Sequence, residues 1–267
     1  MQTELSGKWA LVTGASSGIG VVLAEELARR GAGLVLAARR REALEELAAT
    51  LRSRYGVQVQ VHAGDLSSAG EPERLFDAAS KSGVEISVLA NNAGFGMYGT
   101  FDSIDPAAEE GMIDLDIKAV VRLTRLFVPA MRTAGFGRVL FTASIGAYSP
   151  QPLYAVYCAA KAFVASYGMA IRHELRGTGV TVTVLSPGVV TTGFHRVAGH
   201  ESNRFKERTG MPAGPVGRAA VRALLRGKAE IVPGFLNKLL VFSTRLVSRP
   251  LQASMAGGLM EETIRTR

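Results

Sequence analysis

Residues 13–20, TGASSGIG, constrain the fold of this chain more than any other stretch. They follow an apolar run at 9–13 that is typical of a buried strand, and they precede residues 21–30, where apolar side chains recur at helical spacing. Gly14 permits a tight turn, and the later glycines carry no side chain to keep a pyrophosphate away from the amides that begin the helix. Strand, glycine turn and helix in this order indicate a dinucleotide site, although an isolated match is often an ordinary connection.

A second set of residues, in the middle of the chain, has the composition of a proton-transfer site. Tyr157 and Lys161 are four residues apart, a spacing that places a phenol and an ammonium on one face of a helix. Ser144 stands thirteen residues before the tyrosine and follows the apolar run at 139–142. Taken singly, these residues are equally well a surface tyrosine, a solvated lysine and a loop serine. Their combination with the glycine turn favours catalysis.

Together these features resemble the short-chain dehydrogenase/reductase family. Five motifs follow the order and spacing of that family between about residues 8 and 195: TGxxxGxG at 13–20, NNAG at 91–94, the serine at 144, YxxxK at 157–161 and a PG turn at 187–188. The resemblance implies a nicotinamide-dependent oxidoreductase in which Ser144, Tyr157 and Lys161 are the catalytic residues.

Strand-like apolar runs alternate with longer helix-like stretches, which is the rhythm of a parallel sheet with crossover helices. These runs lie at 9–13, 33–37, 57–62, 86–90, 137–142, 180–185 and 229–232. The chain has 267 residues, 47% of them hydrophobic, and neither a linker nor a repeat, so one domain is expected. We therefore predict an α/β fold, a Rossmann-type doubly wound parallel sheet with helices on both faces.

Three segments are expected within this single fold. Residues 1–233 would form the dinucleotide-binding and catalytic part. Residues 191–212 stand where the family carries a mobile substrate-binding loop, whose closure would exclude water. Residues 234–267 would form a basic, amphipathic C-terminal extension.

The end of the second strand-like run indicates which dinucleotide binds. A protein that binds NAD places an acidic residue there for the ribose 2′-hydroxyl, whereas this chain has Ala38 followed by Arg39. A guanidinium binds a 2′-phosphate through charge-assisted hydrogen bonds, and a carboxylate would repel it, so the expected cofactor is NADP(H). The alternative is that the arginines at 39–41 only begin a solvated helix.

The other cofactor contacts are implied by the resemblance. Asp65 and Leu66 would lie at the adenine, and Lys161 would bond the nicotinamide ribose. The complete set of predicted cofactor-binding residues is Gly14, Ser16, Ser17, Gly18, Ile19, Gly20, Arg39, Asp65, Leu66, Asn91, Ala93, Gly94, Tyr157, Lys161, Pro187, Gly188, Val189 and Thr192.

Hydride transfer to a ketone leaves an alkoxide that needs a proton, and Tyr157 is the predicted donor. The pKa of a free phenol is about 10, and the positive charge of Lys161 is expected to lower it. Ser144 is expected to hydrogen-bond the carbonyl oxygen and to stabilise the charge that develops there.

One position departs from the pattern of the family. On the helix before the fifth strand the family has an asparagine that helps hold a water in the proton relay to the lysine, and the best register places Asp116 there. An aspartate can hold the same water, but an ionised carboxylate would also pair with Lys161 and weaken its effect on Tyr157. The alternative is a carboxylate buried for structural reasons.

The residues expected around the open end of the site are nearly all apolar, which favours a lipophilic ketone such as a 3-oxoacyl thioester, a steroid or a polyketide over a sugar. Several of them are equally well core residues of adjoining elements. The set is Phe95, Met97, Tyr98, Tyr148, Pro150, Leu153, Tyr154, Val189 and Phe194.

Residues 234–251 predict a basic amphipathic helix. Its apolar face would carry Phe235, Leu239, Phe242 and Leu246, and a second face Lys238, Arg245 and Arg249. The apolar face would either pack on the body or on another subunit, or cap the substrate cleft and touch an anionic membrane weakly. The charges make a membrane-spanning helix an improbable alternative.

Charge, cysteine and histidine content exclude several other classes. The net charge is +8, but residues 218–267 carry nine Lys/Arg and three Asp/Glu, which leaves 22 basic and 20 acidic side chains before them and no basic stripe for nucleic acid. Cys158 is the only cysteine, and it is expected to be a small core residue rather than a nucleophile. The four histidines lack metal-ligand spacing, so no metal site is predicted.

Cellular context and assembly follow from the same features. A single cysteine fits a reducing compartment, and the first eight residues contain no apolar leader, so we expect a cytoplasmic protein. The resemblance implies a homodimer or homotetramer. Two other functions stay open: an NADP(H)-binding sensor or scaffold with low turnover, which Asp116 favours, and a membrane-surface protein of lipid metabolism.

Overall fold

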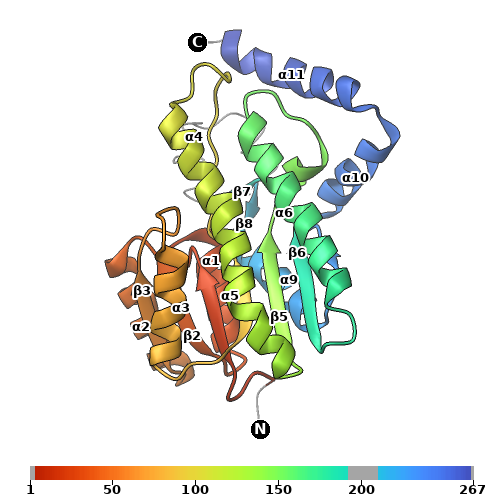
Figure 1. The fold of residues 1–267 in the computed structure, drawn as a ribbon. Helices are drawn as coiled ribbons and strands as arrows, with labels where there is room; N and C mark the ends of the chain where they lie inside the picture. The colour runs from red at the N-terminus through yellow and green to blue at the C-terminus, as the bar shows by residue number, and fades with distance from the viewer. Residues whose placement is uncertain (1–3, 192–209, 266–267) are drawn as a thin grey trace.

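The computed structural model describes residues 4–191 and 210–265, the side chains of the last helix only as far as residue 258. Seven parallel strands form the central sheet in the order β3-β2-β1-β4-β5-β6-β9 (Figure 1). They are β1 (Trp9–Thr13), β2 (Gly33–Ala38), β3 (Val59–Ala63), β4 (Ile86–Asn91), β5 (Gly137–Thr142), β6 (Val180–Leu185) and β9 (Glu230–Ile231). This sheet confirms the predicted doubly wound α/β fold in a single domain.

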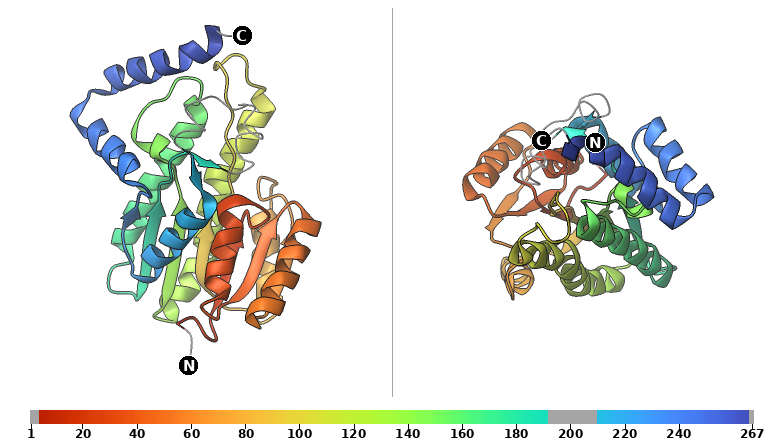
Figure 2. Two further views of the ribbon diagram at one scale, coloured as in Figure 1. Left: turned by 180° about the vertical axis from the view of Figure 1, so that it is seen from behind. Right: turned by 90° about the horizontal axis from the view of Figure 1, so that it is seen from above.

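Helices cover both faces of the sheet. Figure 1 shows α3, α5 and α6 in front of it, and the rear view in Figure 2 shows α1, α2 and α9. The helices are α1 (Gly18–Ala28), α2 (Arg41–Tyr55), α3 (Glu71–Lys81), α4 (Pro106–Ile113), the π-helical turn η1 (Asp114–Ala119), α5 (Val120–Thr133), the 3-10 turn η2 (Ile145–Tyr148), α6 (Ala155–Glu174), α9 (Ala213–Leu225), α10 (Phe235–Ser243), the 3-10 turn η3 (Thr244–Leu246) and α11 (Arg249–Arg265). None of the described helices is long and apolar enough to cross a bilayer.

The central strands are apolar on both faces because each face is covered by helices. Val12 belongs to the cluster that includes Leu27 of α1 and Val216 of α9. The preceding residue, Leu11, belongs to the opposite cluster, with Val164 of α6. Successive residues of a strand point to opposite faces, so a strand buried on both sides is a continuous apolar run.

The structure differs from the predicted runs at the sheet edges. β3 begins at Val59 rather than at 57, and the last strand has only two residues. A separate parallel pair, β7 (Val190–Thr191) and β8 (Met211–Pro212), was not predicted. Each of these strands is too short to show a period, and their pairing joins residues about twenty positions apart.

The order of the strands determines where a ligand can bind. β1 lies between β2 and β4, so the connections that leave β1 and β4 diverge and leave a crevice at the carboxyl ends of the strands. The glycine turn follows β1 directly, and the NNAG sequence begins at the last residue of β4. Both motifs therefore stand at this crevice.

The glycine turn is packed so tightly that two of its glycines leave no room for a side chain. Gly14 has a φ of +66°, and a Cβ there would lie 2.9 Å from the Cα of Ala93. A Cβ on Gly20 would lie 2.2 Å from the carbonyl oxygen of Gly14. The need for glycine at position 20 thus arises inside the turn itself, in addition to any approach of a pyrophosphate.

We expect Gly20→Ala to lower the free energy of unfolding by about 1–3 kcal/mol, the range for overpacked sites, because the backbone oxygen of Gly14 cannot move aside without opening the turn. Gly111→Ala is the matched control, since a Cβ at that position in α4 meets nothing within 4 Å. It should be neutral or stabilising by up to about 1 kcal/mol through helix propensity. Chemical denaturation measures both, and equal effects would contradict the packing argument.

Candidate active site

The hydroxyl group of Thr13 joins the glycine turn to the end of β4. Its Oγ1 donates to the carbonyl oxygen of Ala90 at 3.2 Å and accepts from the amides of Asn92 and Ala93, both at 2.9 Å. The side-chain amide of Asn92 donates in turn to the carbonyl oxygen of Thr13 at 3.0 Å. Two motifs about eighty residues apart in the sequence are thereby held in one fixed geometry.

The start of α1 is suited to an anion. Ser17 occupies the N-cap position without a capping hydrogen bond from its side chain, so it does not satisfy the amides of the first turn. Gly18 has a φ of +57°, which supplies the sharp entry into the helix. The predicted contacts Ser16 and Ile19 flank this point.

Two arginines lie at the carboxyl end of β2, and only one of them was predicted as a cofactor contact. The side chain of Arg39 is 69% exposed, and its guanidinium lies 3.9 Å from the carboxylate of Asp65. Arg40 donates from its guanidinium to the carbonyl oxygen of Ser16 at 2.8 Å, so it braces the glycine turn. No local pattern distinguishes the two arginines in the sequence, because the difference depends on how β2 and the turn meet.

The loop after β3 holds the other predicted adenine contacts. The carboxylate of Asp65 accepts from the amide and the hydroxyl of Ser67, at 3.1 and 2.7 Å, and Leu66 is buried. Together with the amides that begin α1 and the free guanidinium of Arg39, these groups match the chemistry of a dinucleotide: anion donors, a cation at the ribose end and an apolar adenine contact. The residues present therefore fit this class of cofactor.

A buried ion pair joins Lys161 of α6 to Asp116 in η1. The two side chains are almost fully buried, and the Lys161 Nζ lies 2.8 Å from the Asp116 Oδ2. The other carboxylate oxygen accepts from the amide of Phe95 at 3.1 Å. The pKa of Asp116 is raised, because loss of hydration outweighs the stabilisation of the carboxylate by Lys161 and Phe95.

Gly94 makes this pair possible. A Cβ at that position would lie 2.8 Å from the Lys161 Nζ and 2.9 Å from the Asp116 Oδ1. The π-helical turn that carries Asp116 has no recognisable sequence signal, although such turns are frequent at functional sites.

Tyr157 and Ser144 meet at the front of α6. The two side chains are hydrogen-bonded, and the Ser144 Oγ also accepts from the amide of Gly146 at 3.1 Å. Loss of hydration raises the pKa of the Tyr157 phenol, the hydrogen bond with Ser144 lowers it, and the negative charge of Asp116 raises it further.

The net direction of the Tyr157 pKa is opposite to the one expected from the sequence. The Lys161 Nζ lies 5.7 Å from the centre of the Tyr157 ring, but its charge is compensated by Asp116 at half that distance. Cys158, the next residue, is buried, and its pKa is raised to about 12, so the thiol stays protonated near neutral pH.

Aromatic rings extend from Tyr157 along the predicted substrate border. The ring centres of Tyr154 and Tyr157 are 6.0 Å apart, and those of Tyr98 and Tyr154 are 5.1 Å apart. Leu153, next to this row, has a φ of +65°, and its carbonyl oxygen accepts from the amide of Gly99 at 3.0 Å. Tyr148 differs from these residues, because its hydroxyl bonds Ser186 and Glu230 at the edge of the sheet.

The PG turn at 187–188 lies between the catalytic segment and the C-terminal helices. The carbonyl oxygen of Pro187 accepts from the amide of Ile145 in η2 at 2.9 Å, and that of Val189 accepts from Met211 at 2.9 Å. A Cβ on Gly188 would lie 2.5 Å from the side chain of Asn237 in α10. The predicted residues Thr192 and Phe194, and most of the loop at 191–212, lie outside the described residues.

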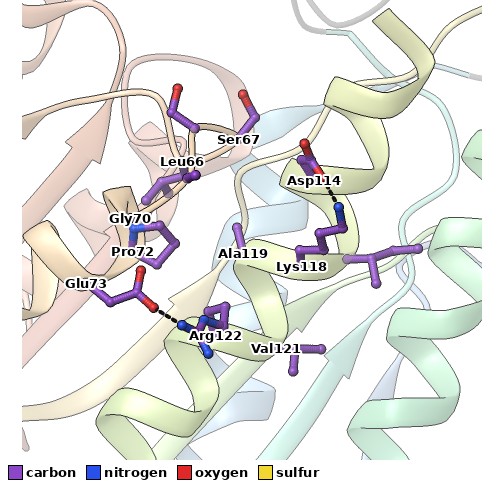
Figure 3. A pocket seen from close by; sticks show the side chains of 13 residues that line it. Leu66, Ser67, Gly70, Pro72, Glu73, Asp114, Lys118, Ala119, Val121 and Arg122 are labelled. Atoms are coloured by element: carbon purple, nitrogen blue, oxygen red, sulfur yellow. Dashed lines mark ion pairs between the residues drawn. The ribbon is translucent and has the colours of Figure 1, made fainter. Parts of the chain in front are cut away.

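A cavity of about 470 Å³ lies on the other side of the adenine loop (Figure 3). Leu66 is the one predicted site residue in its wall, which otherwise comes from the start of α3 and from η1 and α5. Two ion pairs cross or border it, Asp114 with Lys118 at 2.6 Å and Glu73 with Arg122 at 2.5 Å (Figure 3). Its charged groups are thus already paired, and it is separate from Tyr157.

Known proteins resemble this chain in sequence and in fold. Residues 8–203 match the family described as short chain dehydrogenase. A very-long-chain 3-oxoacyl-CoA reductase of Danio rerio is 34% identical over 201 residues, which are 74% of this chain. The match spans 64% of the length of that relative.

Solved structures agree with this assignment. A short-chain dehydrogenase from Sphingobium yanoikuyae in complex with NADPH is 31% identical, with a TM-score of 0.80 over 85% of this chain and 88% of that one. A short chain dehydrogenase/reductase from Burkholderia phymatum in complex with NAD is 27% identical, with a TM-score of 0.80 over 91% of this chain and 93% of that one. The chain therefore belongs to the short-chain dehydrogenase/reductase family of oxidoreductases.

Proposed function

We propose that this chain is an NADPH-dependent oxidoreductase that reduces a ketone, or oxidises the corresponding secondary alcohol, on a lipophilic substrate. The observation that carries the proposal is the arrangement of Ser144, Tyr157 and Lys161 beside the crevice at the carboxyl ends of β1 and β4. A protein that only senses the dinucleotide would need no proton donor at this place.

In the proposed reaction a bound nicotinamide dinucleotide supplies the hydride. The hydroxyls of Ser144 and Tyr157 hold the carbonyl oxygen of the substrate, and Ser144 stabilises negative charge as it develops there. Tyr157 then transfers its proton to the alkoxide oxygen. The raised pKa of Tyr157 keeps the phenol protonated until the substrate is held, and Lys161 and Asp116 control how readily the proton is replaced.

Arg39 supports the preference for NADPH. Its guanidinium is exposed at the end of β2, where a 2′-phosphate would lie, and its one ionic neighbour there, Asp65, is 3.9 Å away and partly solvated. Such a surface pair is weak, so a phosphate can compete for the guanidinium. Relatives with NADPH and with NAD both exist, so the preference rests on this residue.

The lipophilic substrate is supported by the row of aromatic rings beside Tyr157 and by the name of the Danio rerio relative, a 3-oxoacyl-CoA reductase. We propose that residues 191–212 and 234–267 complete the border of the substrate site on the body formed by residues 1–233. The direct test is to incubate the purified protein with NADPH or NADH and with 3-oxoacyl, steroid, polyketide and sugar ketones. Turnover of sugars alone would refute the substrate class.

Replacement of the predicted proton donor should abolish turnover. We expect Tyr157→Phe to lower kcat by about 10²–10⁴-fold, the usual contribution of a general acid, while the affinity for NADPH, measured by fluorescence titration, changes little. Tyr167→Phe, the same change on the same helix with its ring against Phe141, is the control and should retain activity. Substantial turnover by Tyr157→Phe would refute the assignment.

Reversal of the charge at Arg39 should change the cofactor preference. We expect Arg39→Glu to lower the ratio of kcat/KM for NADPH to that for NADH by about 10–100-fold, which corresponds to about 1.5–3 kcal/mol for hydrogen bonds to a charged group. Arg54→Glu, at the far end of α2, makes the same change in net charge and should leave the ratio unchanged. Equal ratios in the two variants would show that Arg39 is only a surface residue.

Asp116 also bears on the alternative of a low-turnover sensor, which the Asp116–Lys161 pair favours. Its carboxylate raises the pKa of Tyr157, so replacement by a neutral amide should lower that pKa and move the phenol limb of the pH–rate profile to lower pH. We expect Asp116→Asn to have equal or higher kcat. Because burial raises the pKa of Asp116 itself, the difference from the wild type should be largest at high pH, where the carboxylate is ionised.

The control for Asp116 is Asp114→Asn, which removes a carboxylate from the same π-helical turn. Asp114 pairs with Lys118 at the surface rather than with Lys161. Its pH–rate profile should match that of the wild type. An unchanged profile in Asp116→Asn as well would place Asp116 outside the proton relay.

A further inference from the structure

The C-terminal helices expose an unusual amount of apolar surface. We define the C-terminal apolar face as the side chains of Phe235, Leu236, Leu239, Leu240, Phe242 and Leu246. More than half of each is exposed, with 79% at Phe235 and 75% at Leu246. Soluble surfaces seldom gather so many large apolar side chains in one place.

This face is held in a fixed position on the body. Val241 of α10 is buried, and Asn237 donates to the carbonyl oxygen of Pro233 at 2.8 Å and packs on Gly188. The turn into α11 is closed by Gln252, whose side-chain amide donates to the carbonyl oxygens of Thr244 and Val247, both at 2.7 Å. The inner side of α10 is thus satisfied, and the apolar side chains point outward by construction.

The charges around the face are of one sign. Lys238, Arg245 and Arg249 are exposed, and residues 234–258 contain no Asp or Glu. A surface that combines large apolar side chains with cations only is complementary to an anionic lipid headgroup layer, where each Lys or Arg contributes attraction and the apolar side chains enter the acyl boundary.

A second copy of the chain is a poorer occupant. An isologous contact would bring the same three cations against their own equivalents, without an acidic residue in the face to compensate them. The described helices are also too short or too polar to span a bilayer, so attachment would be at the interface. We infer that the C-terminal apolar face docks this protein on the surface of an anionic membrane.

The place of the face gives this docking a consequence for the proposed function, on which this part of the inference rests. Asn237 packs on Gly188, in the turn that contacts the catalytic segment, and Gly257 of α11 approaches Pro152. Figures 1 and 2 show α10 and α11 at the carboxyl end of the sheet, beyond the strand tips. A membrane on this face would therefore adjoin the mouth of the substrate site, where a lipophilic ketone could enter from the bilayer.

The test is flotation of the full chain, without cofactor or substrate, on vesicles of phosphatidylcholine alone and of phosphatidylcholine mixed with phosphatidylglycerol. We expect binding to the anionic vesicles that weakens with added NaCl. Charge reversal at three positions, Lys238→Glu, Arg245→Glu and Arg249→Glu, should reduce the bound fraction at least tenfold. Because no turnover is measured, the result is independent of whether the proposed reaction is correct.

The matched control reverses three cations at the opposite end of the helices, Arg54→Glu, Lys81→Glu and Arg132→Glu, with the same change in net charge, and should float like the wild type. Leu239→Gln with Leu240→Gln should also lose flotation, while its mass by light scattering stays that of the wild type. Absence of flotation at low salt, equal loss in both charge variants, or a smaller oligomer in the leucine variant with flotation intact would overturn the inference.

Discussion

The buried hydroxyl of Thr13 is the contact on which the geometry of the whole site depends. It fixes the end of β4 against the glycine turn, and the residues that follow on β4 are carried into place with it. Gly94 then passes close to the Lys161 ammonium and the Asp116 carboxylate, and the amide of Phe95 bonds that carboxylate. A side chain on the first strand thereby sets the position of groups on η1 and α6.

Two kinds of close packing maintain this arrangement. In the glycine turn and at Gly94, the absence of a side chain lets backbone and charged groups approach one another. At Lys161 and Asp116, two charges are removed from water and can stay ionised only because each is the partner of the other. The second device has a cost for chemistry, because the same carboxylate that stabilises the lysine makes the phenol of Tyr157 harder to ionise.

The family and the parallel sheet could be predicted because their signals are local: a glycine turn between a strand and a helix, and continuous apolar runs that are buried on both faces. The brace from Arg40 to Ser16, the contact of Asn237 with Gly188 and the bonds of Tyr148 to Ser186 and Glu230 could not. Each joins segments that are distant in sequence, and none involves a residue type that is restricted to such contacts. The direction of the Tyr157 pKa was missed for a related reason, since it depends on which neighbour compensates Lys161.

The contact between Asn237 and Gly188 makes the C-terminal extension and the PG turn a single unit of inheritance. A glycine at 188 is the shape that α10 requires in order to lie against the body, and Asn237 is the side chain that fills the space. Homologous recombination or domain grafting that exchanged the extension alone would deliver a helix cut for a different turn. Chimeras between this chain and its relatives should therefore place their junction before Pro187, so that turn and extension travel together.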